Sequence, residues 1–226
     1  MSSKQALLYS ILILMPIIAG CGPAQNSLRP PSEALSQINT LAIVVTSDKA
    51  FEVVKNRATA DGTAGAMFGV AGVIIAAKSD ENQDKELADA LSGSLGEFDS
   101  QGVFIKSLSS ELKNANLTAN RFTKINLIKS APADGEYDAV VTLDVTQWGL
   151  RLIERESELM AGFMDIDMKM KTTSDNKIIW NERQMIAGQG RNNIIHYKNE
   201  TGLLQNEMKQ TAADAASQIS NLLIYR

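Results

Sequence analysis

The chain has 226 residues, with 22 basic and 26 acidic side chains and a formal net charge of -4. Its only cysteine is Cys21 and its only histidine is His196, which excludes internal disulfides, cysteine metal clusters and histidine-rich metal sites. The mildly acidic balance, without basic blocks, argues against nucleic acid as a partner.

Residues 1–20 have the composition of a cleavable secretory signal peptide. Lys4 supplies a short positive start, an almost entirely apolar run extends from Ala6 to Ala19, and small residues close it. A transmembrane helix is the alternative, but it needs roughly 20 apolar residues, and this run is shorter and contains Pro16. We therefore predict that residues 1–20 are removed on export.

The sequence Ile18-Ala19-Gly20-Cys21 resembles the lipobox of bacterial lipoproteins. The resemblance implies that Cys21 becomes the first residue of the mature chain and carries acyl chains such as palmitate, which anchor it to a membrane. Gly22 follows the cysteine, whereas an aspartate at that position favours the inner membrane in this family. The resemblance therefore implies a lipoprotein of the bacterial outer membrane, with its domain in the periplasm.

Residues 21–38 are predicted to form a lipidated N-terminus and a tether that leads to the folded domain. Pro23, Pro30 and Pro31 favour extended backbone and disfavour a helix interior. Residues 39–226 are then predicted to form a single envelope domain, which is long enough to bury a core.

A glycine-rich apolar insertion over residues 58–78 follows the first predicted strand, Leu41–Val45, whose continuous apolar sequence is typical of a central strand. Small residues recur in the insertion at steps of four and three residues, which places them on one face of a helix. They are Ala58, Gly62, Gly65, Gly69, Gly72 and Ala76. Glycine in a helix costs up to ~1 kcal/mol relative to alanine, and close approach of another helix is the usual compensation. The four glycines of this set are therefore candidate packing or oligomerisation residues.

Three interpretations of this insertion remain open. The uncharged residues 62–77 would rise only ~24 Å as a helix, short of a hydrocarbon core of roughly 30 Å, so a full membrane span is the weakest interpretation. A packed glycine-rich helix and a flexible glycine loop are the other two. In each case, exposure of so apolar a segment would mark a contact with a partner or a membrane.

Periodicity predicts the next elements of the domain. Lys78–Glu86 is predicted to be a solvated loop, Val103–Leu117 an amphipathic helix and Lys124–Lys129 a short strand. Tyr137–Leu152 is predicted to be a long strand, in which the apolar residues change faces before Trp148.

The C-terminal part contains the clearest patterns. Arg151–Glu158 is predicted to be a turn, and apolar and charged residues then alternate strictly from Met164 to Lys171, as in an antiparallel strand with one buried face. Thr172–Asn176 is predicted to be a turn, Lys177–Ala187 a strand and Glu200–Leu223 a helix lying across the sheet. The predicted fold class is α+β, with a single mixed or antiparallel sheet of four to five strands, two main helices packed on it, and the glycine-rich insertion.

A carboxylate cluster is the strongest candidate for chemistry. Asp165 and Asp167 lie two residues apart on one predicted strand and share a face, and Asp144 is predicted on a neighbouring strand. Such a cluster would suit a cation or acid–base catalysis. Lys169 and Lys171 continue the same row, which favours an ordinary solvated sheet face instead.

Two further motifs are weak. His196 is a lone histidine predicted in a loop, and no serine nucleophile motif accompanies it. Gly188-Gln189-Gly190 lacks the further glycine and the following helix of a nucleotide-binding loop. The sequence therefore predicts no catalytic residue, no metal ligand and no cofactor.

The order of the predicted elements resembles a loose group of small envelope lipoproteins, which includes activators of peptidoglycan synthases and the curli-secretion lipoprotein. Tyr137-Asp138-Ala139-Val140-Val141 and Lys177-Ile178-Ile179-Trp180 are similar to strand edges of that group. The resemblance implies a non-enzymatic accessory protein that binds another envelope protein. The alternatives are a homo-oligomeric subunit of an outer-membrane pore or secretion apparatus, assembled through residues 62–77, and a hydrolase that depends on His196.

Overall fold

The computed structural model describes residues 35–55, 81–130, 132, 135–154 and 158–225. The predicted signal peptide, the lipobox with Cys21, most of the tether and the glycine-rich insertion with its candidate packing residues lie outside the described residues. The predictions made for those segments therefore remain predictions.

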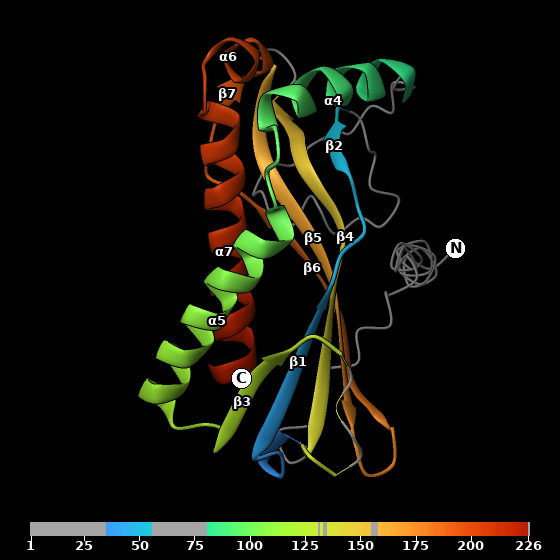
Figure 1. Cartoon of the computed structure of the whole chain (residues 1–226), viewed down its shortest axis with the longest axis vertical. Coiled ribbons are helices and arrows are strands. Elements are labelled where there is room, and N and C mark those ends of the chain that lie inside the picture. Colours follow the sequence, from blue (N-terminus) through green and yellow to red (C-terminus); the bar gives the residue numbers. More distant parts are fainter. Residues whose placement is uncertain (1–34, 56–80, 131, 133–134, 155–157, 226) are drawn as a thin grey trace, which may run out of the picture. The chain divides into compact units, whose positions relative to one another are not determined.

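Seven strands form one mixed sheet among the described residues (Figure 1). They are β1 (Thr40–Thr46), β2 (Phe51–Val54), β3 (Lys124–Ile128), β4 (Ala139–Glu154), β5 (Leu159–Thr172), β6 (Ile178–Ala187) and β7 (Asn192–Asn193). β3, β1, β4, β5 and β6 lie side by side in that order, and β2 and β7 pair with β4 and β5. The pairs β1–β3, β1–β4 and β2–β4 are parallel, whereas β4, β5 and β6 form an antiparallel meander.

The mixed α+β architecture is confirmed, but the predicted sheet of four to five strands is too small. Five strands form the continuous sheet. The additional strands β2 and β7 are four and two residues long, which is too short to leave a periodic pattern in the sequence.

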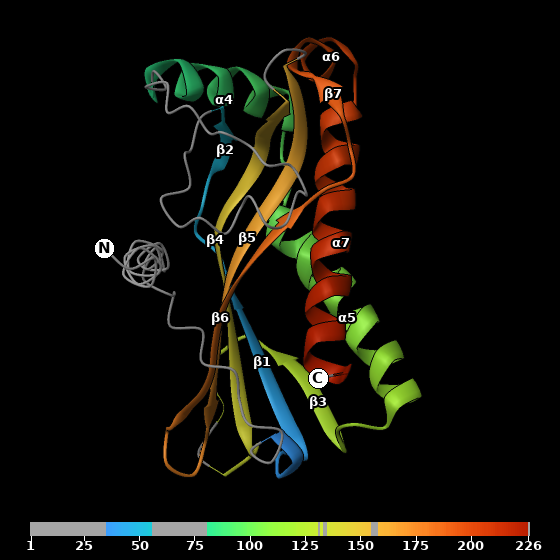
Figure 2. The ribbon, with the colours of Figure 1, turned by 180° about the vertical axis from the view of Figure 1, so that it is seen from behind.

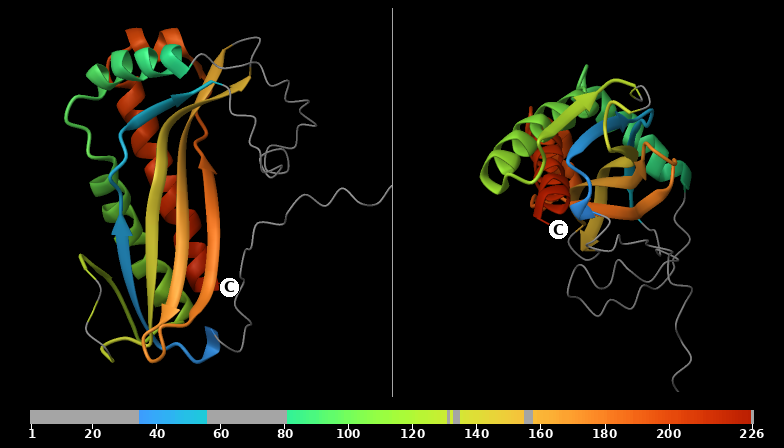
Figure 3. Two further views of the ribbon diagram at one scale, coloured as in Figure 1. Left: turned by 90° about the vertical axis from the view of Figure 1, so that its right-hand side faces the viewer. Right: turned by 90° about the horizontal axis from the view of Figure 1, so that it is seen from below.

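The described helices are α4 (Glu81–Leu95), α5 (Ser100–Ala119), α6 (Ile194–Asn199) and α7 (Leu203–Tyr225). The two long helices α5 and α7 pack against each other along one face of the sheet, as the opposite views of Figures 1 and 2 and the side view of Figure 3 show. Their buried residues recur at helical spacing, so each turns one apolar face to the core. None of the helices in the described ranges combines the length and the apolarity that crossing a membrane requires.

The predicted loop Lys78–Glu86 is wrong from Glu81 onward, where α4 begins. Ala88, Leu91 and Leu95 are buried at a helical spacing and anchor α4 on the core. The polar residues before Ala88 form the first turns of the same helix. The prediction of a loop was wrong because it was based on their polar composition alone.

The predicted turn Arg151–Glu158 is wrong in its first half, because β4 continues to Glu154. Arg151 still pairs with Ala161 of β5 in the antiparallel register. The charged side chains of this stretch therefore belong to a strand that has an outward-facing side.

A β-bulge in β4 explains why the apolar residues of this strand change faces. Val145 pairs with Ile166 and Gln147 pairs with Asp165, so Thr146 is an extra residue on β4. The Thr146 hydroxyl donates a hydrogen bond to the Asp165 carbonyl (3.3 Å), which gives the bulged residue a partner across the pair. A single extra residue, Thr146, therefore explains why the buried apolar positions of β4 shift by one residue along the strand.

The bulge turns Trp148 toward the helix side of the sheet. Trp148 is buried, and its ring contacts Phe51 of β2 (centroids 5.5 Å apart) and Phe98 of the α4–α5 connection (6.1 Å). Its indole N–H donates to the Lys49 carbonyl (2.8 Å). Trp148 therefore links β4, the segment between β1 and β2, and the connection between two helices.

Glycine is required at position 149, where β2 approaches β4. Gly149 has a φ of 148°, and an added Cβ would lie 1.8 Å from the Glu52 carbonyl oxygen. We expect Gly149→Ala to lower the free energy of unfolding by at least ~1–3 kcal/mol, because it combines a strained backbone with a clash against backbone atoms.

Gly93→Ala is the matched control for this substitution. Gly93 lies inside α4, and nothing lies within 4 Å of an added Cβ, so we expect a gain of up to ~1 kcal/mol from better helix propensity. Urea unfolding followed by far-ultraviolet circular dichroism measures both variants. Equal stability of Gly149→Ala and the wild type would contradict the close approach of the two strands.

The start of β1 is held by a carboxylate clamp. Asp138 accepts hydrogen bonds from the backbone N–H groups of Asn39 and Thr40 (both 2.8 Å), while the Thr40 hydroxyl accepts one from the Asp138 N–H (2.8 Å). These backbone bonds favour the ionised carboxylate and hold the pKa of Asp138 below its ordinary value.

A lowered pKa makes this contribution depend on pH. The stabilisation is fully present above the pKa that Asp138 has in the unfolded chain, and it is lost as the pH falls through the lower pKa of the folded state. We expect Asp138→Asn to be less stable than the wild type at pH 7, and the gap to narrow below about pH 4. Urea unfolding between pH 7 and pH 2.5 tests this, and a gap that stays constant across the series would contradict the clamp.

Candidate functional site

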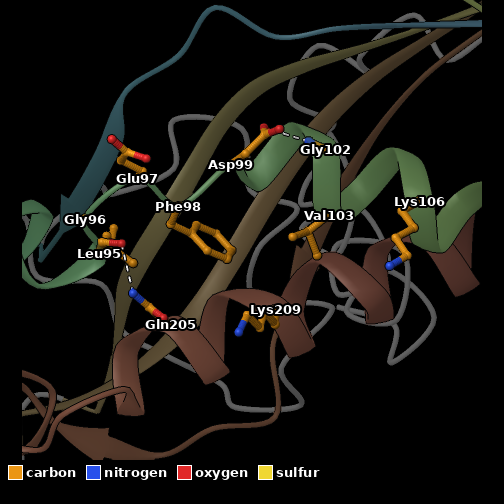
Figure 4. A pocket seen from close by; sticks show the side chains of 10 residues that line it. All are labelled: Leu95, Gly96, Glu97, Phe98, Asp99, Gly102, Val103, Lys106, Gln205 and Lys209. Atoms are coloured by element: carbon orange, nitrogen blue, oxygen red, sulfur yellow. Dashed lines mark hydrogen bonds between the residues drawn. The ribbon is translucent and has the colours of Figure 1, made fainter.

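A shallow groove lies between the α4–α5 connection and the N-terminal half of α7 (Figure 4). Its volume is about 490 Å³, and it is open to solvent. The groove is lined by Leu95, Gly96, Glu97, Phe98, Asp99, Gly102, Val103, Lys106, Gln205 and Lys209. No residue of this set was singled out by the sequence analysis, because the groove depends on the contact between two helices distant in sequence.

Hydrogen bonds at both ends hold the α4–α5 connection in place. Gln205 of α7 donates through Nε2 to the Leu95 carbonyl at the end of α4 (3.0 Å). Asp99 caps the start of α5, where its Oδ1 accepts from the Gly102 N–H (2.7 Å). An added Cβ at Gly102 would lie 2.1 Å from the Asp99 Oδ2, so glycine leaves room for the capping carboxylate. The wall of the groove is therefore formed before any ligand binds.

Charges of opposite sign lie on opposite sides of the groove. Lys106 of α5 and Lys209 of α7 are both exposed. Figure 4 shows Glu97 on the α4–α5 connection, on the other side of the Phe98 ring from both lysines, and Val103 on the side of Lys106. An apolar centre with charged groups at its rims is an arrangement for binding, since the rim charges can orient a partner.

The predicted carboxylate cluster is only partly solvated. Asp144 of β4 and Asp167 of β5 are direct register partners, as expected of neighbouring strands, and the Asp167 side chain is 51% exposed. The Asp165 side chain is only 2% exposed, so the predicted solvated face is wrong at this position. Its Oδ2 accepts hydrogen bonds from Arg151 of β4 (3.1 Å) and Arg183 of β6 (3.2 Å).

The two arginines explain how a carboxylate can be buried at Asp165. They come from the strands on either side of β5, and each places a guanidinium group on the same carboxylate oxygen. The Arg151 guanidinium also stacks on the Phe163 ring (4.0 Å to the centroid). Within the part of the chain that the structure describes, no group of three or more His, Cys, Asp or Glu side chains is arranged to hold a metal ion.

The Gly188-Gln189-Gly190 segment has a structural role that the sequence analysis missed. Glu207 of α7 is buried, and its Oε1 accepts a hydrogen bond from the Gly162 N–H of β5 (2.8 Å). Added Cβ atoms at Gly188 and Gly190 would lie 2.8 Å and 1.8 Å from the Glu207 carboxylate oxygens. The glycines therefore let the chain after β6 pass directly over a buried carboxylate. A charged residue inside the apolar stripe of the predicted last helix was the available signal.

The short helix α6 lies beside this buried carboxylate. Tyr197 is buried, and its burial is the main cause that raises the pKa of its hydroxyl to about 12, with the charge of Glu207 acting in the same direction. His196 is the preceding residue of α6, so the prediction of a loop at this position is wrong. The Asn193 side chain caps this helix, which is the local reason that the segment is helical. The His196 side chain is exposed.

No protein-family model and no curated protein matches the chain. A comparison with solved structures finds a protein from Xanthomonas campestris of the DUF330 family model, at 8% identity and TM-score 0.40, in a match that covers 82% of this chain and 84% of that chain. Another is the PelC dodecamer from Paraburkholderia phytofirmans, at 10% identity and TM-score 0.30, with 84% and 95% covered. A third is a minor lipoprotein from Acinetobacter baumannii, at 14% identity and TM-score 0.35, with 54% and 86% covered. Identities and TM-scores this low assign the chain to no family.

The Glu207 contact leads to a stability prediction. We expect Glu207→Ala to lower the free energy of unfolding by about 1–3 kcal/mol, because the Gly162 N–H stays buried without its acceptor. Glu207→Gln keeps an acceptor oxygen in the same place, so a much smaller loss is expected. Urea unfolding together with hydrogen exchange of the Gly162 amide measures both effects. Equal losses in the two variants would show that the hydrogen bond from the Gly162 N–H to the Glu207 side chain does not stabilise the fold.

Proposed function

We propose that the protein is a lipid-anchored envelope lipoprotein whose α+β domain is a non-enzymatic binding component of a cell-envelope complex. The lipobox-like sequence that ends at Cys21 carries this proposal, because it joins export to covalent attachment at the first residue of the mature chain. A proline-containing tether over residues 21–38 then separates the lipid from the domain. The expected location is the periplasmic side of the outer membrane.

The place where the tether enters the domain supports a role away from the membrane surface. Arg121, two residues after α5, donates hydrogen bonds to the carbonyls of Leu35 and Ile38 and so fixes the entry point. The groove instead adjoins Asp99 and Gly102 at the other end of α5. Since α5 has 20 residues, these two places are about 30 Å apart along the helix. The groove is therefore at the other end of α5 from the point where the tether enters the domain.

A self-assembling subunit of a pore or secretion apparatus is the second candidate. The small-residue face of residues 62–77 is suited to close helix packing. The Lys55 N–H donates to the Asp84 carboxylate (3.3 Å), so the chain leaves for the insertion and returns from it at one place on the domain.

The lipoprotein proposal predicts a specific labelling pattern. Bacteria that express the chain and are fed radioactive palmitate should yield a labelled protein in the outer-membrane fraction, whereas Cys21→Ser should be unlabelled and keep its signal peptide. Gly22→Asp should keep the label and move to the inner membrane. An unlabelled wild-type chain, or a labelled Cys21→Ser variant, would overturn the proposal.

The same labelled membranes distinguish the second candidate. Electrophoresis without boiling would reveal a detergent-resistant oligomer, which should disappear when Gly65→Leu and Gly69→Leu are combined if the insertion joins subunits. A labelled protein that migrates as a monomer in both forms would leave the accessory binding role.

A further inference from the structure

The groove at the α4–α5 connection has two lysines that no carboxylate of the described residues neutralises. Lys106 and Lys209 project from different helices, and neither forms an ion pair within the described ranges. Figure 4 shows Lys106 on α5 and Lys209 on the facing helix α7, both beyond the Phe98 ring from Glu97. Two ammonium groups without a carboxylate partner at the rim of an apolar groove attract a negative group of a partner.

The acidic side chains of the groove do not cancel this attraction. The Asp99 carboxylate is turned back onto the first turn of α5, where it accepts the Gly102 N–H (2.7 Å). Glu97 lies on the opposite side of the Phe98 ring from the lysines. The groove therefore has a direction, since the lysines of α5 and α7 attract a negative group and Glu97 of the α4–α5 connection repels it.

The centre of the groove is apolar and rigid. The Phe98 ring is partly buried and contacts Trp148, which the β-bulge holds in the core. Val103 lies beside it on the first turns of α5. A side chain that covered these two residues would gain from burial at little ordering cost, because the wall is already fixed.

We propose that this groove binds a short segment of a partner protein in which apolar residues alternate with aspartate or glutamate. An apolar side chain of the segment covers Phe98 and Val103, and acidic side chains of the segment pair with Lys106 and Lys209. Glu97 excludes the reversed placement. The inference rests on the proposed function as a binding component, and it names the chemistry of the partner and the residues that recognise it.

Two peptides of eight residues test the proposal, one alternating leucine with aspartate and one alternating leucine with asparagine. Each carries fluorescein, and fluorescence anisotropy follows its binding to the full chain in detergent micelles, with empty micelles as the baseline. The aspartate peptide should bind more tightly, and its affinity should fall as salt is raised. Lys106→Glu combined with Lys209→Glu should weaken it on the order of tenfold or more, and Glu97→Lys should strengthen it.

A second pair of charge reversals provides the control. Lys113→Glu with Lys171→Glu makes the same change in net charge at exposed positions outside the groove, and it should leave binding unchanged. Equal binding of the two peptides, or equal weakening by the two pairs of substitutions, would overturn the proposal. Palmitate labelling of Cys21 does not depend on the groove, so failure here would leave the lipoprotein proposal standing.

Discussion

One extra residue in β4 is the constraint on which the rest of the domain depends. The bulge at Thr146 lets a 16-residue strand serve two partners, since β1 pairs before it and β2 pairs after it. It also changes which side chains face the helices, and so places Trp148 in the core. Trp148 in turn supports Phe98, which forms the centre of the groove. The candidate binding surface is thus tied to the register of the sheet.

Sequence periodicity was sufficient where one element alone determines the pattern. The alternation from Met164 to Lys171 predicted β5, and helical spacing predicted α5 and α7. Burial of Asp165 was not predictable in this way, because the compensating arginines come from two other strands. The change of faces before Trp148 was visible in the sequence, but only the register with β5 identifies it as a bulge.

The candidate site was beyond sequence reasoning for a similar physical reason. Its wall is a short connection between two helices, and Gln205 on a third helix holds that connection from about a hundred residues away. The sequence shows two glycines at positions 188 and 190, but the reason for them is the close approach of the Glu207 carboxylate of α7. In both cases the role of a short segment depends on a side chain that is distant in the sequence and becomes its neighbour only in the folded chain.

The hydrogen bond between Lys55 and Asp84 has a consequence for how the domain tolerates change. It holds together the described residues on either side of residues 56–80, so the fold itself closes this connection. The entropy of closing a loop rises only logarithmically with its length, by about 0.6 kcal/mol per doubling. A change in the length of the segment at this position should therefore cost the sheet and the core little stability. The sheet and the core would then stay the same while this one segment changes.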